Sequence, residues 1–200
     1  MMIALASLEG WHILALDVKS TFLYGKLDKE IYMEQPEGFK AKGQEQKVLH
    51  LHRALYGLCQ AALAWWKELA SSMKCLGFKH LSSDAGIFIY KEKDGIVVTI
   101  IYVDNAMFFG KNPELIHQKK QIFMDMWECC DLDEAQEFLY MHIKQKGNKI
   151  YLDQTAYLEK VLQHFRMVNC LYRERHNVMV CARSRSFQRT IKERLRQSLQ

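Results

Sequence analysis

Two aspartates stand where apolar, strand-like runs of the sequence end, and they are the residues best placed to do chemistry. Asp17 closes the run 12–17, and Asp104 follows the run 96–103. Either aspartate alone is more typical of a solvated turn. On adjacent strands, however, two carboxylates can hold Mg²⁺ ions, which activate a hydroxyl group and stabilise a leaving phosphate oxygen. The pair therefore indicates phosphoryl transfer, a chemistry that depends mostly on positioning and charge neutralisation.

The segments that would position these aspartates mix strand patterns with helix patterns. The runs 87–90 and 96–103 are joined by Asp94-Gly95, which is a strong hairpin signal. The chain then returns through 106–109, so that Asp104-Asn105 lies at the tip of a second tight hairpin. Further strands are predicted over 30–34, 47–52, 137–144 and 149–153, and helices over 1–8, 61–76, 112–128 and 155–165. This mixture predicts an α+β fold with helices packed on one face of an antiparallel sheet.

Composition is that of a globular protein that stays inside the cell. The chain has 200 residues, of which 49% are hydrophobic, and this is enough for one domain with a sizeable core. It has no apolar run of the roughly 20 residues that would span a membrane, and no signal peptide is recognised. The six cysteines form no CxxC pair or metal-ligand spacing, so we expect unpaired thiols in a reducing compartment.

The net charge of +5 is concentrated at one end of the chain. Residues 171–200 contain eight Lys or Arg and two acidic residues, whereas residues 1–170 contain 20 basic and 21 acidic residues. The net charge of residues 1–170 therefore gives little support for nucleic-acid binding by that part of the chain, because phosphate-binding surfaces are usually basic.

Several motifs give the sequence a family resemblance. The run Leu16-Asp17-Val-Lys-Ser-Thr-Phe22 continues to Gly25, and Leu27 to Phe39 follows. Further along lie Leu55-Tyr-Gly-Leu58 with Gln60-Ala61 and Trp65 or Trp66, then Tyr102-Val-Asp-Asn105, and finally 152–167. In this order, over residues 1–170, the sequence resembles the reverse transcriptase domain of copia-type retrotransposons, an RNA-directed DNA polymerase encoded within a polyprotein.

The resemblance implies a palm-like antiparallel sheet and a set of site residues. Asp17 and Asp104 would be catalytic residues and ligands of Mg²⁺, with Mn²⁺ as the alternative ion. Phe22 would lie under the incoming sugar, Gln60 near the nucleotide and template, and Tyr102 at the primer end. The implied partners are an RNA or DNA template-primer and deoxynucleotides.

The sequence also departs from the family pattern. Asn105 occupies the position of a third catalytic aspartate, so the site loses one negative charge and a good hard-cation ligand. The remaining departures are replacements at positions where the family has proline, a Pro-Cys pair or glycine: Ala62, Ala85-Gly86, Asp133 and His142.

Both ends are expected to differ from a complete enzyme. A basic fingers segment would precede residue 1, so the fingers are expected to be largely missing. Residues 171–200 are interpreted as a basic tail that is not homologous to the family, with a shifted reading frame preferred over a functional tail. We interpret the chain as a decayed copy with weak or no activity, which self-associates through exposed apolar faces. The alternative is a non-catalytic nucleic-acid-binding relic that uses the basic tail.

Overall fold

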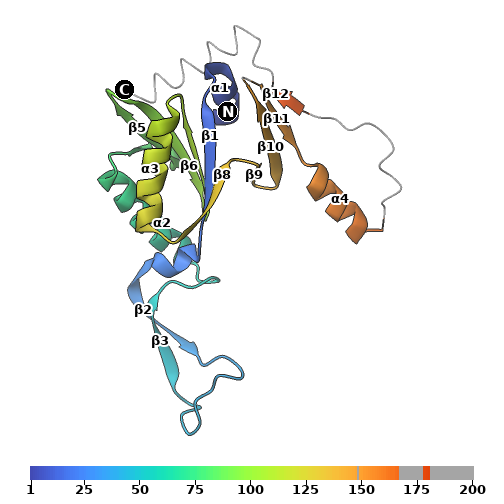
Figure 1. Cartoon of the computed structure of the whole chain (residues 1–200). Coiled ribbons are helices and arrows are strands. Elements are labelled where there is room, and N and C mark those ends of the chain that lie inside the picture. The colour runs from blue at the N-terminus through green and yellow to red at the C-terminus, as the bar shows by residue number, and fades with distance from the viewer. Residues whose placement is uncertain (148, 167–177, 181–200) are drawn as a thin grey trace.

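A six-stranded antiparallel sheet forms the main body of the fold (Figure 1). Asp17 lies in one of its strands, and Asp104 lies in the tight turn between two others. The computed structural model describes residues 1–147 and 149–166, and the backbone of residues 178–180. The sheet has the strand order β4-β5-β6-β7-β1-β8, with antiparallel pairing at every step. Its strands are β1 (His12–Val18), β4 (Lys79–Leu81), β5 (Asp84–Glu92), β6 (Gly95–Tyr102), β7 (Asn105–Gly110) and β8 (Cys129–Glu134).

Helices α2 (Ala61–Cys75) and α3 (Pro113–Met126) cover one face of this sheet. Their apolar side chains, Trp65, Leu69 and Phe123 among them, pack against Leu16 and Phe108 of the sheet. Asn112 caps α3 as predicted, since its side chain accepts hydrogen bonds from the backbone N–H groups of Glu114 and Leu115. This face contains the larger aromatic side chains of the core.

The opposite face is covered as well, so the expectation that helices pack on one face only was wrong for the first helix. Met2, Leu5 and Ala6 of α1 (Met2–Glu9) pack against Ile13 and residues on the far side of the sheet. The physical reason lies in β1, whose residues 13–16 are buried on both sides and need apolar partners on both sides.

A second, four-stranded sheet lies beside α1 on that face (Figure 1). It has the order β12-β11-β10-β9 and is formed by β9 (Glu137–Phe138), β10 (Met141–Lys146), β11 (Lys149–Asp153) and β12 (Val178–Val180). Helix α4 (Thr155–His164) follows β11 and has no buried residue. The rest of the segment 171–200, expected to be a basic tail, lies outside the described residues.

A hairpin of β2 (Lys26–Glu34) and β3 (Val48–Arg53) extends from the body (Figure 1). It starts after the short 3-10 helix η1 (Thr21–Tyr24). Gly25 lies at the base of this hairpin, where an added Cβ atom would come within 2.9 Å of the Ala64 Cβ and of the backbone nitrogen of Trp65. A glycine is therefore needed for the close approach of this turn to α2.

The predicted strands and helices are confirmed in type, with ends that shift by a few residues, except that the strand predicted over 137–144 is divided into β9 and β10 by a turn at Leu139 and Tyr140. Three edge strands, β4, β8 and β12, were not predicted. The fold is thus a mixed α/β arrangement with mainly antiparallel sheets and, in the described residues, four α-helices. None of the helices in that part of the chain is both long and apolar enough to cross a membrane.

Candidate active site

The register between β1 and β7 brings the sequence-predicted residues together. Asp17 pairs with Asn105 across the two strands, and the Val18 N–H donates a hydrogen bond to the Asp104 carbonyl at 2.7 Å. Asp17, Asp104 and Asn105 are all half-buried. Because the hairpin tip that follows β6 lies beside the end of β1, two segments separated by more than eighty residues in sequence meet at one place.

The tip that carries Asp104 has a strained backbone. Val103 and Asp104 connect β6 to β7, and Val103 has a φ of 58°, in the left-handed region. A β-branched residue rarely adopts this conformation, and it persists only where the surrounding structure holds it. One such restraint comes from Trp65, whose indole Nε1–H donates a hydrogen bond to the Val103 carbonyl at 2.8 Å.

The two carboxylates influence each other electrostatically. Partial burial raises the pKa of Asp17 above its ordinary value, and the negative charge of Asp104 raises this pKa further. Burial and the charge of Asp17 also raise the pKa of the neighbouring Cys129 to about 11, so this thiol is protonated at neutral pH. The negative charges of Asp17 and Asp104 thus disfavour ionisation of neighbouring groups. A cation bound between them would reduce this repulsion.

Asn105 contributes a hydrogen-bond donor to this charge cluster. Its Nδ2 atom donates to the Oδ1 atom of Asp104 at 2.8 Å, which uses part of the capacity of that carboxylate. Among the described residues, no set of three or more His, Cys, Asp or Glu side chains is grouped so that it could hold a metal ion. Asp17 and Asp104 are the residues here that could hold one hard divalent cation, with water in the remaining positions, and two carboxylates alone would make such a site weak.

An open pocket of about 670 Å³ surrounds these residues and is called the carboxylate pocket below. Tyr102, which is 58% exposed, lines it together with Asp17, Asp104 and Asn105. The sequence interpretation missed the opposite wall, where β8 contributes Cys130 and Leu132, β9 contributes Glu137 and Phe138, and the turn after β9 contributes Leu139 and Tyr140. The stretch 129–134 has no apolar alternation, so only the pairing of β8 with β1 could have identified it.

Phe22 and Gln60 lie outside the carboxylate pocket. Phe22 belongs to η1 and packs edge-on against Tyr56, with 4.6 Å between the ring centroids. Gln60 precedes α2 and lines a separate pocket of about 310 Å³, whose other lining residues include three lysines: Lys26, Lys29 and Lys67. Both residues therefore lie near the start of α2, Phe22 against its first turn and Gln60 directly before it. Their roles remain predictions.

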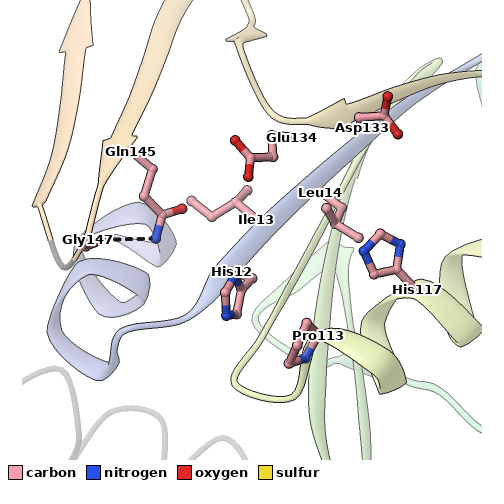
Figure 2. Close-up of a pocket in the computed structure, with 9 residues that line it drawn as sticks. All are labelled: His12, Ile13, Leu14, Pro113, His117, Asp133, Glu134, Gln145 and Gly147. Carbon is pink, nitrogen blue, oxygen red and sulfur yellow. Dashed lines mark hydrogen bonds between the residues drawn. The ribbon is translucent and has the colours of Figure 1, made fainter.

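A further pocket of about 330 Å³ lies at the other end of β1 (Figure 2). His12, His117, Asp133 and Glu134 line it, and Gln145 hydrogen-bonds through Nε2 to the carbonyls of Trp11 and Gly147. In Figure 2 the two histidines come from different elements, β1 and α3, and the acids from β8. In the part of the chain that the structure describes, however, neither these four side chains nor any others form a group of three that could hold a metal ion.

Comparison with known proteins agrees with the motifs. The family model described as reverse transcriptase (RNA-dependent DNA polymerase) matches residues 1–176. The retrovirus-related Pol polyprotein from transposon TNT 1-94 of Nicotiana tabacum is 37% identical over 157 residues, which is 77% of this chain and 12% of that protein. The corresponding polyprotein from transposon RE1 of Arabidopsis thaliana is 33% identical over 160 residues, 80% of this chain and 11% of that protein.

A yeast relative is more distant. The transposon Ty1-BL Gag-Pol polyprotein of Saccharomyces cerevisiae is 29% identical over 111 residues, 55% of this chain and 6% of that protein. The chain therefore spans only about a tenth of the length of the plant polyproteins that it matches. The family match over most of the chain, together with these transposon relatives, shows that the chain belongs to the reverse transcriptase (RNA-dependent DNA polymerase) family, as a domain of the copia type.

Proposed function

We propose that this chain is an RNA-directed DNA polymerase domain of a copia-type polyprotein whose catalytic centre has decayed, so that its activity is weak or lost. The observation that supports this most is the strand register that sets Asp17 opposite Asn105 and beside Asp104. This arrangement supports the proposal that Asp17 and Asp104 are two of the three expected carboxylates and that Asn105 is a neutral amide at the third position.

Asp17 and Asp104 are the residues that would hold Mg²⁺, with Mn²⁺ as the alternative ion. When bound, such an ion would favour deprotonation of a primer hydroxyl and neutralise charge on the phosphates. Asn105 opposes this role in two ways: it lacks the third negative charge, and its amide N–H donates to the Asp104 carboxylate that the ion would need. Both effects lower the affinity of the site for a cation.

The substrates proposed are an RNA or DNA template-primer and deoxynucleotides, bound over a palm-like sheet. Tyr102 is exposed in the carboxylate pocket, a position that suits contact with the end of a primer. Phe22 is proposed to lie under the incoming sugar. Gln60, beside the pocket with three lysines, is proposed to face the nucleotide and the template strand.

A primer-extension assay tests this proposal. The unaltered chain should show no extension with Mg²⁺ and at most slow extension with Mn²⁺. Asn105→Asp should increase extension with Mn²⁺, and adding Asp17→Asn to that variant should abolish the increase. Robust Mg²⁺-dependent extension by the unaltered chain would contradict the proposed decay. An increase in Asn105→Asp that survives loss of Asp17 would contradict the proposed metal site.

A further inference from the structure

We propose that Trp65 is a positioning residue for Asp104: its indole N–H fixes the peptide that joins Val103 to Asp104 and thereby sets the direction of the Asp104 carboxylate. The catalytic meaning of this role rests on the proposed function, whereas the restraint on the hairpin tip can be tested without it.

The two peptides on either side of the Asp104 Cα atom are each held by a hydrogen bond. The Trp65 Nε1–H donates to the Val103 carbonyl, in the peptide before Asp104, at 2.8 Å, and the Val18 N–H donates to the Asp104 carbonyl, in the peptide after it, at 2.7 Å. Because a peptide unit is planar, fixing the direction of its carbonyl fixes the orientation of the Cα atom that follows. The bond from Trp65 therefore determines where the side chain of Asp104 begins.

The strain at Val103 makes this restraint necessary. Its φ of 58° is unfavourable for a β-branched residue, so the tip would relax toward another conformation without an external partner. Trp65 is only 3% exposed, and its indole donates from a fixed position on α2. A hydrogen bond from a buried and immobile donor can hold a strained carbonyl at little further entropic cost.

The ring of Trp65 also links the other segments around the carboxylate pocket. It packs against Tyr24 of η1 and against Trp127, with centroid distances of 5.9 Å and 5.1 Å. The Tyr24 hydroxyl accepts a hydrogen bond from the Glu128 N–H at 3.1 Å, immediately before β8. The segment after Asp17, the hairpin tip and the start of β8 are thus all anchored on one side chain or its direct neighbours.

Trp66 provides a matched control within the same helix. Its indole Nε1–H also donates to a backbone carbonyl, at 3.0 Å, but the acceptor is Ala85 in β5. Substituting either tryptophan by phenylalanine removes one donor and keeps an aromatic ring. A general loss of packing or stability should therefore affect both variants, while a positioning effect should appear only for Trp65.

The experiment compares Trp65→Phe and Trp66→Phe by amide hydrogen exchange and by Mn²⁺ titration, the latter with Asn105→Asp present. Because a net hydrogen bond changes an equilibrium by a factor of about 2 to 12, we expect the Val18 N–H to exchange about five-fold faster in Trp65→Phe. Mn²⁺ affinity should fall by about three-fold or more in the same variant. Trp66→Phe should leave both measurements within about two-fold of the parent.

Unchanged exchange at Val18 in Trp65→Phe would overturn the inference, and so would faster exchange with unchanged Mn²⁺ affinity. If the parent and both variants bind no Mn²⁺, the proposed function fails, and the exchange comparison alone decides whether Trp65 holds the tip. Should Trp65→Phe not fold, benzothienylalanine at position 65 removes the N–H and keeps the shape of the ring, so the same comparison can be made.

Discussion

Asn105→Asp should affect the stability of the free protein and its affinity for cations in opposite directions. The Asn105 Nδ2 atom lies 2.8 Å from the Oδ1 atom of Asp104, so a carboxylate oxygen in its place would meet a like charge at that distance. Two unit charges at this separation repel by about 1.5 kcal/mol even in a dielectric of about 80. We therefore expect Asn105→Asp to unfold more easily than the unaltered chain in the absence of divalent ions.

With Mn²⁺ present the added charge becomes favourable. A divalent ion about 4 Å from a unit charge gains about 2 kcal/mol in the dielectric of water, and about 8 kcal/mol at an effective dielectric of about 20. The carboxylate pocket is open, and Tyr102 beside it is 58% exposed, so the lower value applies. It corresponds to binding that is about 30-fold tighter than in the unaltered chain.

Calorimetric titration with Mn²⁺ and urea denaturation with and without Mn²⁺ measure the two effects. Asn112→Asp is the control, because it adds the same charge at the cap of α3, where aspartate also caps well and no cation site is proposed. The reasoning is refuted if Asn105→Asp gains no affinity over this control, or if it is as stable as the unaltered chain in the absence of the ion.

Four further predictions concern stability. Thr99 is fully buried and its Oγ1 atom has no hydrogen-bond partner among the described residues, so Thr99→Val should raise the free energy of unfolding by about 1 kcal/mol, measured by denaturation. Asp133 has a φ of 51°, so Asp133→Gly should be more stable than Asp133→Ala, by about 1 kcal/mol in the same measurement. Lys120 is 2% exposed and pairs with Asp131, which is 40% exposed. Asp131→Ala leaves the buried Lys120 ammonium without this partner, so it should lower the free energy of unfolding by about 3 kcal/mol, and Lys120→Met should lower it less. Because the folded-state pKa of Asp17 is raised above its ordinary value of 3.8, the contribution of Asp17 to the stability of the chain should fall as the pH rises through the interval between those two values. Denaturation midpoints across this acid range should show that Asp17→Asn lacks the fall and is more stable at neutral pH by a few tenths of a kcal/mol.

Local rules account for the elements that the sequence predicted correctly. The hairpin predicted at Asp94-Gly95 forms with Lys93 and Asp94 as its two loop residues and Gly95 as the first residue of β6. Asn112 with Pro113 marks the start of α3, and both signals depend on neighbouring residues only. The position of Asp17 next to the last residue of β1 could also be predicted, to within one residue, because an apolar run of strand length stops there. Two of the candidate catalytic residues could thus be located without knowledge of the fold.

The remaining features depend on contacts between distant parts of the chain. Strand β8 has little apolar character of its own and forms because β1 offers it an edge. Likewise, no local pattern shows that α1 covers the second face of the sheet, or that Trp65 and not Trp66 reaches the hairpin tip. Long-range partners of this kind are decided by packing, which propensity and periodicity do not encode.

The replaced glycine positions illustrate the same limit. Asp133 stands where the family pattern has glycine, and its backbone is still left-handed, as that pattern would require. His142, where a second glycine was expected, lies within β10 and has no positive φ. The left-handed residues nearby are Leu139 and Tyr140, with φ values of 50° and 62°. The left-handed backbone in this segment therefore lies two to three residues before His142, which no sequence pattern indicated.

We propose that Asp17 and Asp104 together form the cation site of this domain. Localised cleavage by Fe²⁺ tests it most directly, because Fe²⁺ binds most sites somewhat more tightly than Mn²⁺ and, with peroxide and ascorbate, cuts the backbone near where it is bound. We expect cuts beside residue 17 and within 102–105 of the same molecule, stronger in Asn105→Asp and suppressed by excess Mg²⁺. Cuts at neither position, or cuts confined to the pocket of His12 and His117 at the other end of β1, would contradict the account.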